Sequence, residues 1–117
     1  MENDVHITRA EEWMDSEDHP IPIRDWLVYV NQDPEFRLDS SGKKASPEGS
    51  TVRYENLGHA VWTAWSKHEI DGNLAEFDFE DGRITVKNPD EEILGKMKKV
   101  AQALQANVQG DDGKRYD

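Results

Sequence analysis

Two histidines and two tryptophans gather in the stretch HAVWTAWSKHE, residues 59–69, where catalysis would first be sought. An imidazole beside a carboxylate can take up and return a proton. His59, His68 and nearby carboxylates therefore predict, as one hypothesis, a small hydrolase or a ligand-binding enzyme. The four histidines of the chain show no HxH, HxxxH or HExxH spacing, and cysteine is absent. We expect no metal site, no thiolate chemistry and no cofactor.

The other patterns of chemical residues are weaker. QGDDGKRYD and EIDGNL are acidic turns, but neither has the ligand spacing of a calcium loop. Ser66, His68 and Glu69 are the residue types of a catalytic triad, yet closeness along the chain does not indicate triad geometry. No glycine-rich phosphate loop precedes a helix. We therefore assign no catalytic residue.

Charge is the strongest compositional signal. The net charge of the 117 residues is −11, and residues 1–39 hold eleven acids against three arginines, a net −8. A negative field repels nucleic acid and anionic lipid and attracts a basic partner. No apolar stretch is long enough to span a membrane, and the N-terminus lacks the basic and apolar regions of a signal peptide. These features predict a cytoplasmic protein that binds neither nucleic acid nor membrane.

The acidic N-terminal part also contains tryptophan, which favours a binding surface. Trp62 lies between Ala60 and Ala64, so space beside its ring could be filled by the chain itself or by a partner. We expect the surface to combine the acidic 11–18 segment with exposed aromatic side chains. Its candidate residues are Trp13, Glu11, Glu12, Asp15, Glu17, Asp18, Trp62 and His68.

Alternating apolar residues predict the strands. They mark 4–9, 51–57 and 59–66, and Trp62 and Trp65 should face opposite sides of the last of these. In LAEFDFEDGRITVKN, Asp81-Gly82 predicts a two-residue hairpin that pairs Glu80 with Arg83. Residues 39–50 are polar and predict a loop or a hairpin tip.

Two segments have helical periodicity. IRDWLVYVNQDP should bury Ile23, Trp26, Leu27 and Val30 and end near Asp33. NPDEEILGKMKKVAQALQA should be capped by Asn88, bury Ile93, Met97, Val100 and Leu104, and turn Lys96, Lys98 and Lys99 outward. The order of elements predicts one α+β domain over 1–117, an antiparallel sheet of about five strands with two main helices on one face.

Most of the chain resembles a family of small bacterial proteins of about this length that has no established activity. The matching stretches are ITRAEEW at 7–13, PIPIRDWLVYVNQDPEFRL at 20–38, AVWTAWS at 60–66, and VKNPDEEILGKMKKVAQALQANVQGDDGKRY at 86–116. This chain has Ile23-Arg24-Asp25 where the family has Leu-Asp-Glu. The resemblance implies no catalytic residues.

The leading hypothesis is a non-enzymatic regulatory or immunity-like module that binds a basic protein. The enzyme hypothesis at His59 and His68 is the alternative. Mimicry of nucleic-acid charge is a third possibility, and it would require acids spaced along one face.

Overall fold

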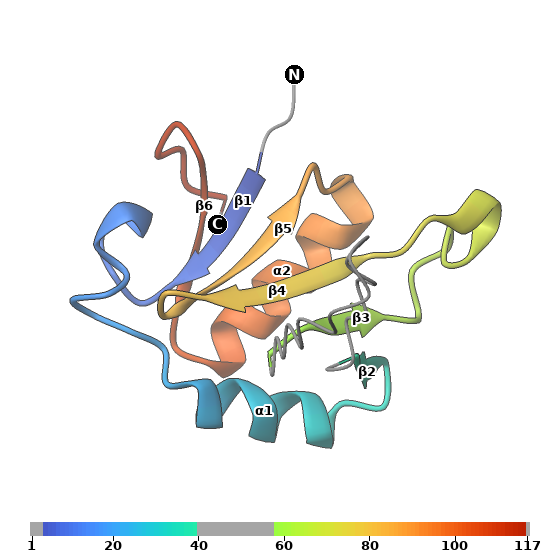
Figure 1. The fold of residues 1–117 in the computed structure, drawn as a ribbon. Coiled ribbons are helices and arrows are strands. Elements are labelled where there is room, and N and C mark those ends of the chain that lie inside the picture. The colour runs from blue at the N-terminus through green and yellow to red at the C-terminus, as the bar shows by residue number, and fades with distance from the viewer. Residues whose placement is uncertain (1–3, 40–57, 117) are drawn as a thin grey trace, which may run out of the picture.

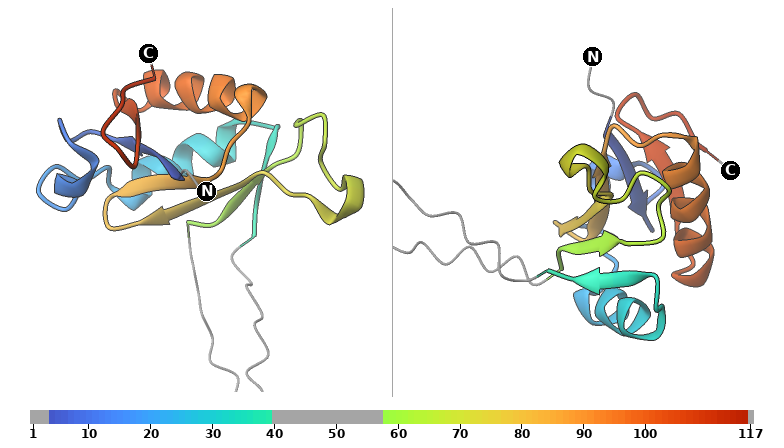
Figure 2. Two further views of the ribbon diagram at one scale, coloured as in Figure 1. Left: turned by 90° about the horizontal axis from the view of Figure 1, so that it is seen from above. Right: turned by 90° about the vertical axis from the view of Figure 1, so that its right-hand side faces the viewer.

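Six antiparallel strands form one sheet in the order β2-β3-β4-β5-β1-β6. The computed structural model describes residues 4–39 and 58–116. The strands are β1 (Asp4–Thr8), β2 (Phe36–Leu38), β3 (Ala60–Trp62), β4 (Glu76–Glu80), β5 (Arg83–Lys87) and β6 (Asn107–Gly110). The helices α1 (Ile23–Gln32) and α2 (Glu91–Ala103) lie on the same face of the sheet (Figures 1 and 2). The predicted α+β fold is confirmed, with six strands where about five were expected.

The β4–β5 hairpin has the predicted register. Glu80 pairs with Arg83, and the two pairs that follow are Phe79 with Ile84 and Asp78 with Thr85. Asp81 and Gly82 have φ values of 52° and 79°, the left-handed pair that a type I′ turn requires. Alternation then places the apolar side chains of both strands on the face that the helices cover.

The hydrophobic core lies between this face and the two helices. Trp26 of α1 is fully buried, and its ring packs against Phe36 of β2 and Phe77 of β4. The Trp26 indole nitrogen donates a hydrogen bond to the Gly58 carbonyl (2.8 Å), which satisfies its one polar group. From α2 the core receives Ile93, Met97, Val100 and Leu104, as the periodicity predicted. On α1 the prediction was right for Trp26 and Val30 and wrong for Ile23, which is exposed, and for Leu27, which is only half-buried.

β3 is shorter than predicted. A strand over 59–66 was expected, but it ends at Trp62 and the chain turns from residue 63 onward. The amide and hydroxyl of Thr63 still donate to the Glu35 carbonyl (2.8 and 2.9 Å), which extends the hydrogen bonding between β2 and β3 by one residue. Trp62 and Trp65 therefore do not serve opposite faces. Trp62 is 7 % exposed within the core, and Trp65 packs against the same core from the turn after the strand. The predicted strand at 51–57 and residues 40–50 of the predicted loop lie outside the described residues.

α2 begins two residues later than predicted. Asn88, expected as its N-cap, has φ = 50° in the turn that follows β5. Asp90 is the cap, and its carboxylate accepts from the Ile93 amide (2.9 Å). Either residue type can satisfy an unpaired amide at a helix start, so only the backbone direction after β5 decides between them.

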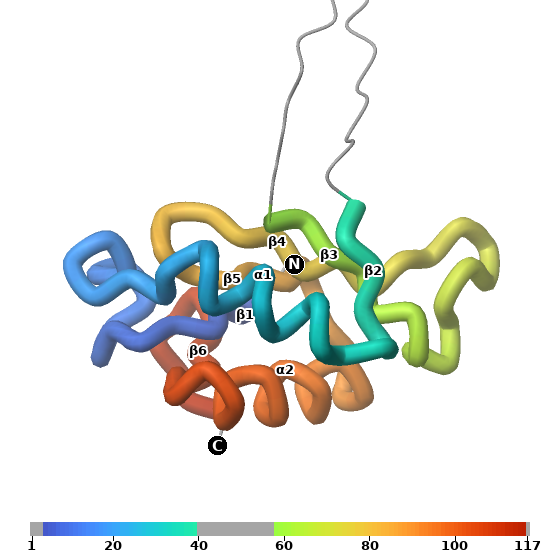
Figure 3. The backbone as a smooth tube through the Cα atoms, turned by 90° about the horizontal axis from the view of Figure 1, so that it is seen from below, coloured from blue at the N-terminus to red at the C-terminus, as the bar shows by residue number. Residues whose placement is uncertain are grey.

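Lys96 corrects a second expectation for α2. It was predicted to face outward, but it is 8 % exposed and donates to Asp33 (2.7 Å) and Glu35 (3.1 Å). These carboxylates follow α1, so the ion pairs join the end of α1 to the middle of α2. The backbones of the two helices lie side by side in Figure 3. Neither α1 nor α2, the α-helices of residues 4–39 and 58–116, has the length and apolar composition of a membrane-spanning helix.

Candidate functional site

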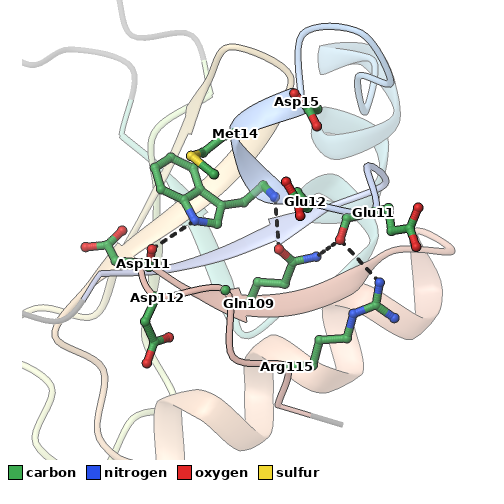
Figure 4. A pocket seen from close by; sticks show the side chains of 10 residues that line it. Glu11, Glu12, Met14, Asp15, Gln109, Asp111, Asp112 and Arg115 are labelled. Carbon is green, nitrogen blue, oxygen red and sulfur yellow. Dashed lines mark hydrogen bonds between the residues drawn. The ribbon is translucent and has the colours of Figure 1, made fainter.

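An acidic hollow of about 570 Å³ lies between segment 11–15 and the turn after β6 (Figure 4). The first segment follows β1 and contains the short 3-10 turn η1 (Trp13–Asp15). β1 and β6 are neighbours in the sheet, which brings two segments about a hundred residues apart in sequence together. The residues that line the hollow are Glu11, Glu12, Trp13, Met14, Asp15, Gln109, Asp111, Asp112, Gly113 and Arg115.

Gln109 fixes the two sides of the acidic hollow to each other. It is 1 % exposed, and its side-chain oxygen accepts from the Trp13 amide (2.9 Å). Its side-chain nitrogen donates to the Glu11 carbonyl (2.7 Å) and to Asn107 (2.6 Å). Arg115 also donates to the Glu11 carbonyl, at 3.2 Å. A buried amide with both ends bonded is costly to displace, so the backbone of 11–13 is held against β6.

His6 supports the tryptophan wall of the hollow from beneath. Its ring stacks on Trp13 with centroids 4.1 Å apart. Nε2 is 2.7 Å from a carboxylate oxygen of Asp111, and Nδ1 is 2.9 Å from the Thr85 hydroxyl. The Trp13 indole donates to the Asp111 carbonyl (3.3 Å), and the Arg83 guanidinium lies 5.2 Å from the Trp13 ring centroid. One wall of the hollow is thus the rigid Trp13 side chain. Its indole ring already makes a cation–π contact with the Arg83 guanidinium.

The rim of the acidic hollow is strongly negative. Five carboxylates line it against the single guanidinium of Arg115. Glu11, Glu12 and Asp15 are exposed to solvent, and the structure gives their carboxylates no ion pair among the described residues. Met14 is 66 % exposed between them, which adds an apolar contact surface to the acidic rim. Such a surface can hold a cationic group with an apolar stem.

The structure brings together four of the eight predicted binding residues. Glu11, Glu12, Trp13 and Asp15 line the hollow. Glu17 and Asp18 are exposed nearby but do not line it. Trp62 was expected to be exposed, which is wrong: its indole is covered by this chain and donates to Glu35 (2.9 Å). His68 lies in the turn after β3 beside Glu69, with 3.5 Å between imidazole and carboxylate.

His59 faces carboxylates on both sides of its ring. Nδ1 makes a short hydrogen bond with Asp78, and Nε2 lies 3.7 Å from Glu76. The bond to Asp78 raises the pKa of His59; burial opposes this, and the charges of Asp78, Glu76 and Asp39 add to the increase. Because both ring nitrogens face carboxylates, neither is directed toward a nucleophile.

A second hollow, of about 430 Å³, lies beside β4 and the start of α2. Its lining includes Trp65, Lys67, Glu76, Asp78 and Asp90, but neither His59 nor His68. The Trp65 indole donates to Asp90 (3.0 Å), so this tryptophan is occupied in holding its turn to α2. Over the described residues, no three His, Cys, Asp or Glu side chains are placed to hold a metal ion.

Sequence reasoning missed the C-terminal half of the acidic hollow. Asp111 and Asp112 were considered as a calcium-like turn, and Gln109 and Arg115 were not considered. One signal was available, because an acidic turn directly after the last strand would lie beside an acidic segment directly after the first strand if those strands paired. Comparison with protein-family models, curated proteins and solved structures finds no match for this chain.

Proposed function

We propose that the protein is a non-enzymatic binding module that recognises a basic segment of a partner protein through the acidic hollow. The observation that supports it best is the set of exposed carboxylates at Glu11, Glu12 and Asp15 around the exposed Met14. These side chains stand on backbone that Gln109 holds rigidly. A preformed negative surface loses little conformational entropy when a cation binds to it.

The carboxylates on the rim of the acidic hollow indicate which side chains a partner would present to it. A lysine or arginine side chain would place its charge among the carboxylates and its methylene stem against Met14 and Trp13. The net charge of −11 steers such a partner toward the protein from a distance. Association should therefore weaken as salt is added, as it does for small regulatory and immunity-like proteins that act through a negative face.

The enzyme hypothesis at His59 and His68 receives less support. His59 has both ring nitrogens beside β4 carboxylates, and His68 is beside its own neighbour Glu69. Neither arrangement pairs a histidine with a nucleophile.

The test compares two doubly substituted proteins with the same change in charge. In the first, E12Q/D15N removes two rim carboxylates whose side chains make no hydrogen bond with any residue of 4–39 or 58–116. In the control, D71G/E91Q removes two exposed carboxylates far along the chain from the hollow, and glycine suits the positive φ of position 71. Each immobilised protein is used to capture partners from an extract of its native host at low salt.

A stoichiometric partner should be captured by the unaltered protein and by D71G/E91Q, and should elute as salt rises. E12Q/D15N should bind the purified partner about tenfold more weakly, because each rim pair contributes up to ~0.7 kcal/mol. The proposal is wrong if no stoichiometric partner is captured at low salt. Equal binding by the two variants would move the interface away from the hollow.

A further inference from the structure

Three Asp-Gly pairs occur in the chain, at Asp71-Gly72, Asp81-Gly82 and Asp112-Gly113, and there is no Asn-Gly pair. At Asp-Gly the glycine amide nitrogen can reach the preceding side-chain carboxyl, because glycine has no side chain to hinder the approach. The reaction also requires the local backbone to rotate. Because the three pairs are chemically identical, differences between their rates of ring formation measure how firmly the fold holds each pair.

Asp81-Gly82 is held on several sides. It forms the tight turn of the β4–β5 hairpin, and the Gly82 carbonyl accepts from the Ile21 amide (2.9 Å). A Cβ at Gly82 would lie 2.6 Å from Pro20 and 2.8 Å from the Ser16 carbonyl oxygen, so the glycine backbone is tightly packed. Rotation here requires the hairpin to open.

Asp112-Gly113 is exposed but is held by hydrogen bonds. The Asp112 carboxylate accepts from the Lys114 amide (3.0 Å), which keeps this side chain on the far side of the turn. The Gly113 amide donates to the Gly110 carbonyl (2.9 Å), so the attacking nitrogen is itself engaged. Both bonds must break before the nitrogen and the carboxyl carbon can meet.

Asp71-Gly72 lacks the tight packing of Gly82 and the carboxylate hydrogen bond of Asp112, and backbone bonds from Asn73 to Ile70 (3.0 Å) and from Glu69 to Asn73 (2.8 Å) close the turn around it. It lies in the second 3-10 turn, η2 (Ile70–Gly72), within the loop between β3 and β4, and both residues are exposed. A Cβ at Gly72 would meet nothing within 4 Å, and no hydrogen bond or ion pair holds the Asp71 carboxylate in the described structure. Asp71 and Glu69 have φ of 54° and 61°, a left-handed conformation that is unfavourable for side chains with a Cβ.

We propose that Asp71 is a site of spontaneous isomerisation to isoaspartate, and that the fold protects Asp81 and Asp112. The Gly72 amide nitrogen bonds to Cγ of Asp71, and one carboxyl oxygen leaves as water with the amide and carboxyl protons. Water then adds to one of the two carbonyls of the resulting succinimide, and that C–N bond breaks. Addition at the backbone carbonyl leaves the chain running through Cγ, which removes the strained left-handed residue.

The test uses the full chain, kept folded in ¹⁸O-labelled water at mildly acidic pH. Each cycle of ring formation and opening inserts one labelled oxygen, which mass spectrometry locates after digestion. Asp71 should take up label at least about tenfold faster than Asp81 or Asp112, which corresponds to about 1.4 kcal/mol less free energy for local opening. Part of the labelled Asp71 peptide should elute separately as isoaspartate.

Two controls separate the fold from the local sequence. In the chain unfolded by urea, the three labelling rates should converge. D71E, which cannot form the five-membered ring, should abolish labelling at position 71 and leave the other two sites unchanged. Equal or slower labelling at Asp71 in the folded protein overturns the proposal. The same applies if the difference between sites persists in urea.

Discussion

His6 and Lys96 are the two buried basic side chains of the described structure, and they stabilise different parts of the fold. His6 lies under Trp13 and holds Asp111, so it supports the acidic hollow. Lys96 lies between Asp33 and Glu35 and joins α2 to the end of α1. A buried charge is tolerated only when partners replace its lost hydration, and each of these side chains has such partners.

Replacing Lys96 with methionine should destabilise the protein. K96M keeps the aliphatic stem but leaves the Asp33 carboxylate, whose side chain is 13 % exposed, without its cation. We expect a loss of roughly 2–4 kcal/mol in the free energy of unfolding, below the full cost of breaking a buried pair because Glu35 is half-exposed.

Urea denaturation measures this loss, and K98M is the matched control. Lys98 is exposed on the same helix, so K98M should change stability by no more than about 0.5 kcal/mol. Similar unfolding midpoints for the two variants would show that the Lys96 ion pairs contribute little.

The β4–β5 hairpin is the element on which the outer segments depend. Segment 16–21 crosses its turn, with the Ile21 amide bonded to Gly82 and Pro20 packed against the same glycine. That contact sets the path of the chain from β1 through η1 to α1, and thus the position of the 11–15 side of the acidic hollow. The Asp81-Gly82 turn, which the local sequence specifies, therefore also positions one side of the acidic hollow.

Gly82 should not tolerate a side chain. G82A places a Cβ at φ = 79° and within 2.6 Å of Pro20, so strain and overpacking act together. We expect a loss of at least about 2 kcal/mol in the free energy of unfolding. The measurement is thermal or urea unfolding, followed by circular dichroism.

A glycine-to-alanine change at position 95 gives the opposite expectation. Gly95 lies inside α2, and a Cβ there would meet no atom of the described part of the chain within 4 Å. G95A should stabilise the protein by roughly 0.5–1 kcal/mol, because alanine favours helix.

If G82A were as stable as the unaltered protein, the close packing of segment 16–21 on the hairpin would be wrong.

The whole molecule should be most stable in a limited range of pH. Burial alone would raise the pKa of Asp33, but hydrogen bonds from Lys96 and Tyr29 outweigh it and lower that pKa. Hydrogen bonds from Trp62 and Lys96 lower the pKa of Glu35. Lowered carboxyl pKa values contribute stability above the unfolded values near 4, and that stability is lost as pH falls through the folded values.

His59 acts in the opposite direction. Its pKa is raised, chiefly by Asp78, so its contribution is complete below the unfolded value and is lost as pH rises through the folded value. The free energy of unfolding should therefore be highest between about pH 4.5 and 6.5 and decline on both sides.

Urea denaturation across a pH series measures this curve, and H59Q tests its alkaline side. H59Q should flatten the decline above about pH 6.5, because it removes the histidine whose pKa Asp78 raises. An unchanged alkaline decline in H59Q would assign that decline to another group.

The sequence by itself determined the features that depend on neighbouring residues. Asp81-Gly82 predicted the hairpin and its register, because few turns suit two residues between strands. Periodicity predicted α1, α2 and the apolar stripe of α2, because a helix repeats its face within a few residues. The acidic segment at 11–18 was likewise visible in the sequence, and part of it lines one side of the acidic hollow.

Only the tertiary structure decided the features that depend on distant pairing. The pairing of β3 with β2 and β4 placed Trp62 in the core beside Lys96, and the chain turns directly after it. The pairing of β1 with β6 brought Asp111 and Asp112 to Trp13 and completed the acidic hollow. Local propensity contains no information about which strands become neighbours, because that choice depends on the packing of the whole core.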